Sequence, residues 1–172
     1  ENLVRFAVHT YGKLNYAVNN AGVGGPPAPV GETELDAWDK VIGINLKGAF
    51  NVLRESARRV RDSGRIITLS TSVVGTRLEN YSAYAASKAA VETMSAILSK
   101  ELRGRNITVN AVAPGPTATD LFLDGKSPEL IERLAKMSPL ERLGTPEDIA
   151  GAVAFLAGAD GGWINGQVLR AN

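Results

Sequence analysis

Cysteine is absent from this sequence of 172 residues, and histidine occurs only once, as His9. Without cysteine the chain can form no disulfide bond, no thiolate metal site and no cysteine nucleophile. A single histidine argues against a Ser-His-Asp triad and against a histidine-rich metal centre. We therefore expect no metal site, and we expect His9 to be an exposed residue of a helix.

The net charge is small, and long apolar runs are absent. Lys and Arg number 19 against 18 Asp and Glu, a net charge of +1 that indicates neither a nucleic-acid partner nor an anionic membrane. No apolar run approaches the roughly 18 residues of a membrane span, and no signal peptide is visible, so the expected compartment is the cytoplasm. With 44% hydrophobic and 22% charged residues, residues 1–172 are expected to form a single domain.

Four short apolar runs are predicted to be buried strands, because each run is nearly continuous and is bounded by turn residues. These strands are Lys13–Asn20, Arg65–Leu69, Ile107–Ala113 and Gln167–Ala171. Amphipathic helices are expected between them, at Leu35–Arg61, Ser82–Leu102 and Glu147–Gly158. Strands that alternate with helices predict an α/β fold, a Rossmann-like doubly wound parallel sheet with helices on both faces.

Three residues are candidate helix caps, because Ser and Thr side chains accept hydrogen bonds from the free N–H groups of a first helical turn. They are Thr33, Ser127 and Thr145. The first residues, Glu1–Tyr11, are predicted to be the end of an amphipathic helix. A domain rarely begins within such an element, and the chain lacks an initiator methionine, so we expect residues before Glu1 in the natural protein.

In a doubly wound parallel sheet, the ligand site lies beyond the carboxyl ends of the strands. This rule selects the stretches Asn19–Gly22, Ser70–Ser72 and Pro114–Thr119. All three carry small or polar residues at the point where the apolar pattern stops. We therefore expect the functional residues to gather at this edge of the sheet.

Tyr84 and Lys88 are four positions apart in the helix Ser82–Leu102, so their side chains leave the same face one turn apart. Tyrosine has an unperturbed pKa of ~10, and a fixed ammonium beside it favours the phenolate and lowers that pKa. The pair predicts an acid/base unit, although this spacing also arises by chance as a solvated Tyr–Lys contact. Tyr81 is a weaker candidate, because the residue four positions after it is Ala85.

Five motifs now occur in a fixed order along the chain. They are Asn19-Asn20-Ala21-Gly22 after a strand, Asn45 in a helix, Ser72 after the next strand, Tyr84-x-x-x-Lys88, and Pro114-Gly115 after the third strand. Together they resemble the short-chain dehydrogenase/reductase family, and within it the beta-ketoacyl carrier-protein reductases. The resemblance covers essentially every residue of the chain.

The resemblance implies a catalytic set made of Asn45, Ser72, Tyr84 and Lys88. Tyr84 would give a proton to a carbonyl oxygen during reduction or take it from an alcohol during oxidation. Lys88 would lower the tyrosine pKa and hold the nicotinamide ribose, and Ser72 would position the substrate oxygen. Asn45 would hold a water that links Lys88 to solvent, which would explain a poor helix former inside a helix. Ser70 and Thr71 are rivals of Ser72, which is preferred because Ser72-Val73-Val74-Gly75 matches the family pattern.

The resemblance also implies a set of cofactor contacts. These residues are Asn20, Ala21, Gly22, Tyr84, Lys88, Pro114, Gly115, Thr117 and Thr119. The first three would lie along the adenosine end of the dinucleotide, whereas the last four would border the nicotinamide and the phosphates. Asn19 would tie strands together, and Thr119 is as well explained as an ordinary loop residue.

The expected activity is hydride transfer between NADP or NAD and a carbonyl or secondary alcohol, such as a ketone or a 3-oxoacyl substrate, with NADP preferred. The family resemblance also implies a homodimer or homotetramer, in which the helices Leu35–Arg61 and Ser82–Arg103 pair with their copies. The stretch Thr117–Pro139 is expected to act as a lid over the substrate.

One departure from the family pattern leaves other functions open. Members begin with a strand, a glycine-rich turn and a helix that bind the pyrophosphate, but the sequence contains no Gly-x-x-x-Gly-x-Gly. The missing part is expected to comprise about two βαβ pieces of ~30 residues each. The alternative is a non-catalytic scaffold or partner subunit that keeps the fold but binds no dinucleotide. A sugar-nucleotide epimerase or dehydratase also uses Tyr-x-x-x-Lys, but 172 residues leave no room for its substrate domain.

Overall fold

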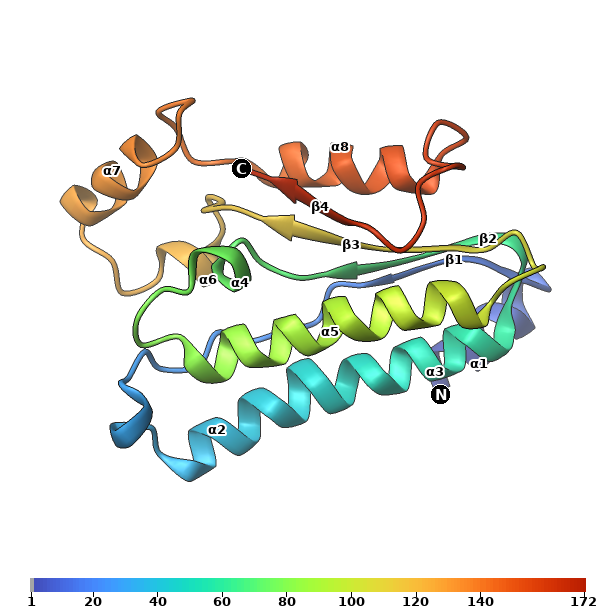
Figure 1. The fold of residues 1–172 in the computed structure, drawn as a ribbon, viewed down its shortest axis with the longest axis horizontal. Helices are drawn as coiled ribbons and strands as arrows, with labels where there is room; N and C mark the ends of the chain where they lie inside the picture. The colour runs from blue at the N-terminus through green and yellow to red at the C-terminus, as the bar shows by residue number, and fades with distance from the viewer. Residues whose placement is uncertain (1) are drawn as a thin grey trace.

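A computed structural model describes residues 2–172 as a four-stranded sheet with helices on both of its faces (Figure 1). The strands are β1 (Leu14–Asn19), β2 (Val60–Leu69), β3 (Thr108–Pro114) and β4 (Val168–Ala171). They lie in the order β1-β2-β3-β4, and each neighbouring pair is parallel. The predicted fold class, a Rossmann-like parallel α/β sheet, is therefore confirmed.

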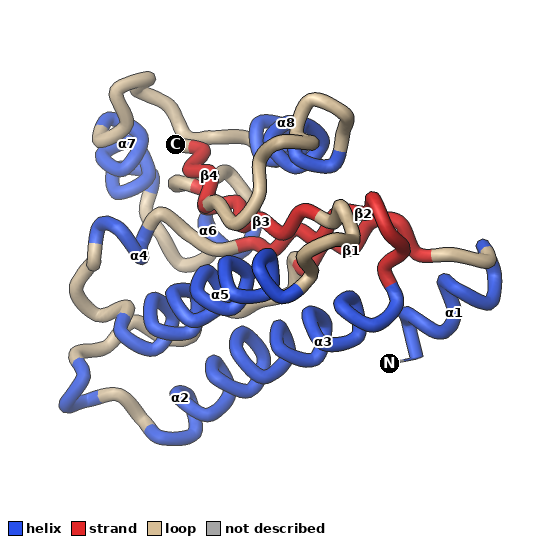
Figure 2. Tube along the Cα trace, turned by 45° about the vertical axis from the view of Figure 1, so that its right-hand side comes forward, coloured by secondary structure: helices blue, strands red, loops and turns tan. Residues whose placement is uncertain are grey.

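Helices fill the connections between the strands. They are α1 (Asn2–Tyr11), α2 (Leu35–Val41), α3 (Ala49–Arg59), α4 (Val73–Thr76), α5 (Ser82–Glu101), α6 (Asp120–Leu123), α7 (Pro128–Lys136) and α8 (Pro146–Ala157), with the short 3₁₀-helix η1 (Val30–Glu32) and the π-helix η2 (Ile42–Gly48). The helices α3 and α5 cover one face of the sheet, and α8 covers the other (Figures 1 and 2).

The core consists of two apolar layers, one on each face of the sheet. Consecutive strand residues point to opposite faces, so Ile66 belongs to the layer under α3 and α5, whereas Ile67 belongs to the layer under α8. Leu98 of α5 packs in the first layer, and Leu156 of α8 packs in the second. This burial on both faces explains why the strands read as continuous apolar runs and not as alternating patterns.

The start of β2 differs from the prediction. The helix predicted over Leu35–Arg61 ends at Arg59, and β2 begins at the buried Val60, before the predicted Arg65. Leu14 pairs with Val60 and Tyr16 pairs with Arg65, so β2 carries an irregularity with extra residues between these two pairs. The early start of β2 has a physical reason in the burial of Val60. Its side chain packs in the apolar core, so the backbone at Val60 already lies in the sheet, ahead of the polar residues that follow it.

The predicted caps have mixed outcomes. The Ser127 side chain accepts a hydrogen bond from Leu130 N–H, and Thr145 forms a full capping box with Asp148, so these two predictions are confirmed. The prediction for Thr33 is wrong, because its hydroxyl donates to the Pro29 carbonyl oxygen and α2 starts one residue later. The turn η1 just before Thr33 brings that carbonyl within reach of the hydroxyl.

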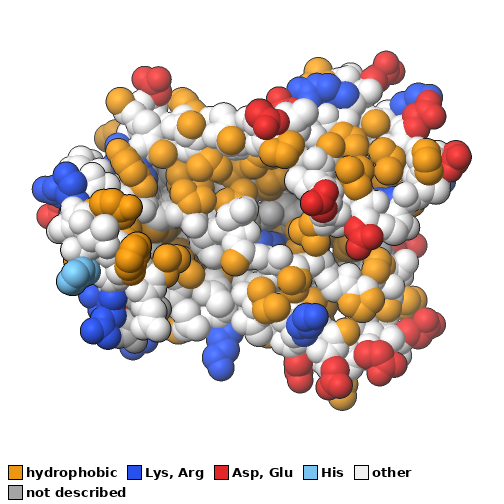
Figure 3. All heavy atoms as spheres, turned by 180° about the vertical axis from the view of Figure 1, so that it is seen from behind, with side chains coloured by type: hydrophobic (Ala, Val, Ile, Leu, Met, Phe, Trp, Pro, Cys, Tyr) orange, Lys and Arg blue, Asp and Glu red, His pale blue; other side chains and the backbone are white. Residues whose placement is uncertain are grey.

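Strand β1 forms one edge of the sheet, and only β2 pairs with it among residues 2–172. The side chains of Tyr16 and Val18 on β1 are 55% and 47% exposed, and Leu3 and Phe6 on α1 are exposed as well. Seen from behind, the molecule shows apolar side chains gathered over part of its surface (Figure 3).

No helix within residues 2–172 has both the length and the apolar character that a membrane span requires.

Candidate active site

The side chains of Tyr84 and Lys88 meet at the carboxyl end of β2. Lys88 is only 5% exposed, and its ammonium donates a 2.8 Å hydrogen bond to the Leu69 carbonyl oxygen at the end of that strand. The same ammonium lies 6.0 Å from the centre of the Tyr84 ring. The helix α5 therefore presents both groups to the edge of the sheet where a parallel α/β fold binds its ligands.

Burial dominates the ionisation of both groups. Burial raises the pKa of the Tyr84 phenol. The Thr71 hydroxyl acts to lower this pKa, and the neighbouring Tyr81 acts to raise it further. Burial also lowers the pKa of the Lys88 ammonium. The phenol pKa therefore shifts in the direction opposite to the sequence prediction, because burial, which disfavours the charged phenolate, is the largest influence on it. A phenol in this environment keeps its proton at neutral pH and can give that proton away.

Asn45 lies inside the π-helix η2 and is 1% exposed. Its side chain accepts a hydrogen bond from Val23 N–H and donates one to Val23 C=O, each at 2.8 Å, and it donates a third to the Ser87 hydroxyl at 3.2 Å. The Ser87 hydroxyl in turn donates to the Tyr84 carbonyl oxygen at 2.7 Å. The side chain of Asn45 thus connects the loop after β1 with the second turn of α5. Wide π-type turns often occur at functional sites.

The loop after β1 passes directly over these groups at Gly22. A Cβ atom added to Gly22 would lie 3.1 Å from the Lys88 ammonium and 3.3 Å from the Asn45 side-chain oxygen. Glycine is therefore needed here for close approach, and not for an unusual backbone angle. Asn20 and Ala21, the two preceding candidates, are exposed at the same edge.

The three hydroxyls after β2 have different surroundings. Ser70 donates a 2.5 Å hydrogen bond to the Glu92 carboxylate of α5, so its hydroxyl points toward that helix. Thr71 is buried, and its hydroxyl accepts a hydrogen bond from Val73 N–H at 3.3 Å. Ser72 is half-buried at the start of α4, and its N–H donates to the Pro114 carbonyl oxygen at 2.8 Å. The structure thus turns the Ser70 hydroxyl toward α5 and places the backbone of Ser72 beside the end of β3.

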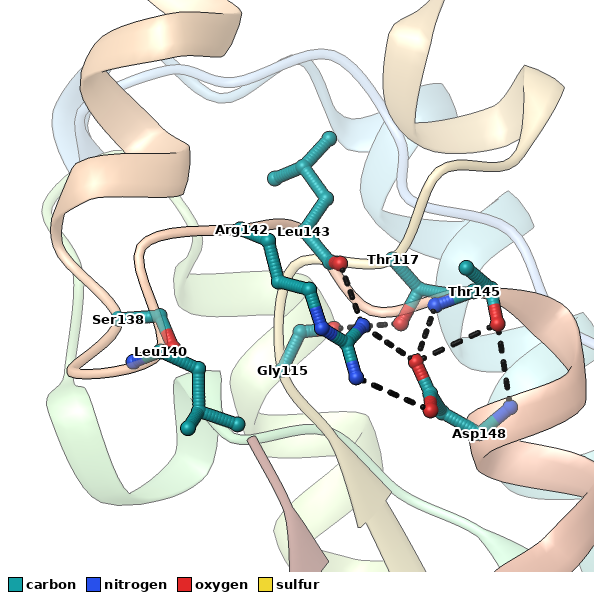
Figure 4. Close-up of polar contacts among 8 residues, drawn as sticks. All are labelled: Gly115, Thr117, Ser138, Leu140, Arg142, Leu143, Thr145 and Asp148. Atoms are coloured by element: carbon teal, nitrogen blue, oxygen red, sulfur yellow. Dashed lines mark hydrogen bonds and ion pairs between the residues drawn. The ribbon is translucent and has the colours of Figure 1, made fainter.

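The end of β3 holds the remaining candidates. Gly115 N–H donates to the Ala171 carbonyl oxygen, and a Cβ on Gly115 would lie 2.5 Å from the Asn172 Cβ, so only glycine fits. The Thr117 hydroxyl donates to the Gly115 carbonyl oxygen at 2.9 Å (Figure 4). The Thr119 side chain caps α6, which favours the structural explanation for this residue.

An isolated strand-like contact outside the sheet joins the two ends of the segment that contains α6 and α7. Thr117 and Gly144 form an isolated parallel bridge, in which Gly144 N–H donates to the Pro116 carbonyl oxygen and Ala118 N–H donates to the Gly144 carbonyl oxygen. Thr117, the first residue of the predicted lid Thr117–Pro139, therefore pairs with Gly144, which lies five residues beyond the predicted end of the lid.

An ion pair holds the second end of this segment in place. The Arg142 guanidinium bonds both carboxylate oxygens of Asp148, at 2.6 and 3.1 Å, and Asp148 also accepts a hydrogen bond from Thr145 N–H (Figure 4). The Arg142 guanidinium holds the pKa of Asp148 well below its usual range. The base of the segment is thus fixed to the start of α8.

The arrangement combines a protonated phenol, a buried ammonium and several hydroxyls at the ends of parallel strands. Such a set can pass a proton to an oxygen atom of a bound molecule. The model of a family described as enoyl-(acyl carrier protein) reductase matches residues 1–172 of the chain. The chain belongs to the short-chain dehydrogenase/reductase family.

Known family members agree with this assignment along nearly the whole chain. A short-chain type dehydrogenase/reductase of Picea abies is 50% identical over 169 residues, which are 96% of this chain and 62% of that protein. An NADPH-dependent aldehyde reductase-like protein of Arabidopsis thaliana, described as chloroplastic, is 48% identical over 92% of this chain and 60% of its own length. The chain thus spans about three fifths of the length of these two curated relatives.

Solved structures of the family share the fold. The angucycline C-6 ketoreductase LanV, solved with bound NADP, superimposes with a TM-score of 0.89 and is 35% identical. The superposition covers 98% of this chain and 66% of the ketoreductase. The resemblance to the short-chain dehydrogenase/reductase family that the five motifs indicated is therefore confirmed.

The sequence did not reveal every residue of this short-chain dehydrogenase/reductase site. Ser87 and Glu92 were not singled out, although both lie on the α5 face that carries Tyr84 and Lys88. Thr71 was weighed only as a rival of Ser72. The available signal was helical spacing, because Glu92 follows Lys88 by four residues just as Lys88 follows Tyr84.

Proposed function

We propose that this chain carries the acid/base centre of an NADP(H)-dependent oxidoreductase of the EC 1.1.1 type. The reaction is hydride transfer between the nicotinamide and a carbonyl or secondary alcohol, such as a ketone or a 3-oxoacyl group. The observation that carries the proposal is the buried Lys88, held by the Leu69 carbonyl oxygen beside a phenol that keeps its proton.

The residues around Gly22 fit a nicotinamide cofactor. A side chain at Gly22 would fill the space next to the Lys88 ammonium, and glycine keeps that space open for a ribose hydroxyl. The other proposed contacts are Asn20, Ala21, Tyr84, Pro114, Gly115, Thr117 and Thr119. When bound, the reduced cofactor supplies the hydride. The preference for NADP over NAD is supported by the NADPH dependence named for the Arabidopsis relative and by the NADP in the ketoreductase.

The protein side of the reaction is proton transfer at the Tyr84 oxygen. The raised pKa of the phenol keeps its proton available for the substrate oxygen in the reductive direction. Lys88 stabilises the phenolate that remains, and Ser72 holds the substrate oxygen. Asn45 keeps the loop after β1 and the second turn of α5 together. Its role in holding a water for Lys88 stays a prediction.

A direct test follows the oxidation of NADPH in the presence of a panel of ketones and aldehydes. We expect Tyr84→Phe to fold like the wild type and to lose turnover by about 10²-fold or more, because general acid catalysis typically contributes that much. Tyr81→Phe is the matched control, since Tyr81 lies one turn earlier and has no cation four residues on. Full turnover in Tyr84→Phe would remove the acid from the proposal.

A second candidate is a scaffold or partner subunit that binds no dinucleotide. The 172 residues contain no Gly-x-x-x-Gly-x-Gly, so they offer no glycine-rich turn of their own to the pyrophosphate. Titration of the purified chain with NADPH, followed by nicotinamide fluorescence, separates the two candidates. Saturable binding that Gly22→Val removes supports the enzyme, and absence of binding supports the scaffold.

We also propose that the protein forms a homodimer or homotetramer through α3 and α5. Phe50 on α3 and Ile97 on α5 are both 51% exposed, which suits a helix face that a second copy covers. Light scattering at micromolar concentration tests this, and a monomer would contradict it. A location in the cytoplasm stays a prediction, and the Arabidopsis relative is described as chloroplastic.

A further inference from the structure

We propose that Glu92 is a positioning residue for Lys88. Through the Ser70 hydroxyl, the Glu92 carboxylate fixes the peptide group between Leu69 and Ser70, whose carbonyl oxygen holds the Lys88 ammonium. The inference rests on the proposed function, because it concerns the ammonium that lies beside the Tyr84 phenol. It assigns a role to a carboxylate that the proposed reaction does not otherwise use.

The helix α5 holds the end of β2 at two points. Lys88 donates a 2.8 Å hydrogen bond to the Leu69 carbonyl oxygen, and Glu92 accepts a 2.5 Å hydrogen bond from the Ser70 hydroxyl. Lys88 and Glu92 are four positions apart, so their side chains leave the same face of α5 one turn apart. Adjacent turns of one helix therefore bind adjacent residues at the end of the strand.

One peptide group carries both the Lys88 contact and a bond to the sheet. In a trans peptide the C=O and N–H groups lie in one plane and point in opposite directions. The N–H of this peptide belongs to Ser70 and donates to the Val112 carbonyl oxygen of β3 at 2.7 Å. Its C=O belongs to Leu69, so it points away from β3 and accepts the bond from Lys88. A rotation of this peptide would therefore move the oxygen that holds the ammonium.

Strand β1 stops short of this peptide. It ends at Asn19, which lies opposite Thr68 in the parallel register, so Leu69 is one residue beyond the paired part of β2 on that side. The pairing with β3 continues through Leu69, opposite Val112. The peptide is thus held by the sheet on one side, and the bond from Ser70 to Glu92 supplies a second restraint.

The bond between Ser70 and Glu92 suits this role in strength and in burial. A hydroxyl that donates to a carboxylate forms a charge-assisted hydrogen bond, which is about twice as strong as one between neutral groups. Ser70 is 5% exposed and Glu92 is half-buried, so water competes little for the contact. The bond therefore keeps the end of β2 in one position relative to α5, with the Leu69 oxygen in reach of the ammonium.

The first test reads the surroundings of Lys88 without cofactor or substrate. In protein isotopically labelled at the lysine Cε, the NMR signal of Lys88 is identified by its absence in Lys88→Met. We expect Glu92→Leu and Ser70→Ala each to move this signal toward those of exposed lysines, because the ammonium loses its fixed acceptor. Glu92→Gln keeps an oxygen that accepts from Ser70, so its signal should stay near that of the wild type. Glu101→Leu, at the exposed end of α5, is the matched control and should leave the signal unchanged.

Turnover provides the second readout. We expect Glu92→Leu and Ser70→Ala each to lower kcat by about 10-fold, because a misplacement of about 1 Å can cost as much as ~10²-fold. KM for NADPH should rise and KM for the carbonyl substrate should change little, since Lys88 serves the nicotinamide ribose and the phenol in the proposed reaction. The double variant should be no slower than either single variant, because both changes remove the same link. Glu92→Gln should recover most of the turnover.

The outcomes that overturn the proposal are distinct. An unchanged Lys88 signal in Glu92→Leu or in Ser70→Ala overturns it, because the link would not pass through the hydroxyl. Losses of kcat that add in the double variant overturn it as well, and so does a moved signal with unchanged kcat and KM, which would make the contact merely structural. If Glu92→Leu does not fold, Ser70→Ala, which removes a single oxygen atom, decides by the same two readouts. Failure of the proposed function would appear separately, as full turnover in Tyr84→Phe.

Discussion

Replacement of Asn45 by alanine should destabilise the protein, because this buried side chain satisfies polar groups on two other elements. Asn45→Ala leaves Val23 N–H and Val23 C=O without their partners, and it removes a donor from the Ser87 hydroxyl. A buried polar group without a partner costs about 1–3 kcal/mol. Val23 is half-buried, so water can reach it in part, and we expect a total loss of about 2–4 kcal/mol.

Helix propensity acts in the opposite direction and supplies the control. Alanine is favoured over asparagine inside a helix by about 0.5 kcal/mol. Asn51→Ala, on the exposed side of α3, should therefore leave stability unchanged or raise it slightly. Only the buried asparagine should show a loss, which identifies the cause as its hydrogen bonds.

Urea unfolding followed by far-ultraviolet circular dichroism measures the difference in the free energy of unfolding between variant and wild type. In thermal unfolding, the same loss should lower the Tm of a chain of this length by roughly 5–15 °C. Asn45→Asp keeps the acceptor for Val23 N–H but loses both donated bonds, so it should lie between alanine and wild type. If Asn45→Ala unfolds at the same urea concentration as Asn51→Ala, the connection through Asn45 contributes nothing and the reasoning is refuted.

Three other predictions concern a close approach, an ion pair and the core. Gly22→Val should abolish NADPH binding in a fluorescence titration, since its side chain would occupy the space beside the Lys88 ammonium; unchanged affinity would contradict the cofactor assignment. Asp148 has a lowered pKa in the folded state, so its contribution to stability is present above its unfolded pKa of ~3.9 and is lost as the pH falls further. Urea unfolding should therefore find Asp148→Asn less stable than wild type at pH 7, and the difference should shrink at pH 3. Leu156→Ala should cost about 2–5 kcal/mol in the same assay, because its side chain is fully buried, whereas Leu121→Ala, at 65% exposure, should cost almost nothing.

Much of the fold follows from local patterns in the sequence. The continuous apolar runs predicted four parallel strands because strands buried on both faces need no polar side. The caps at Ser127 and Thr145 were predictable because the capping bond reaches only three residues along the chain. The spacing of Tyr84 and Lys88 placed them on one face of α5, since four residues make about one helical turn.

The contacts at the site could not be read in the same way, because they join residues far apart in sequence. Asn45 meets Val23 and Ser87, which are 22 and 42 positions away. The predicted lowering of the Tyr84 pKa was wrong in direction because burial depends on the whole packing around the ring. The start of β2 at Val60 likewise depended on the core that α3, α5 and the sheet build together.

The sequence by itself determined the parallel sheet, the edge at which the site lies, and the phenol and ammonium one turn apart. Only the tertiary structure decided that the Ser70 hydroxyl turns to Glu92 of α5 whereas Thr71 bonds within its own turn, to Val73 N–H. Three adjacent residues of similar chemistry look alike in a sequence. Their directions are set by the point where β2 leaves the sheet and by the helix α5 packed across it.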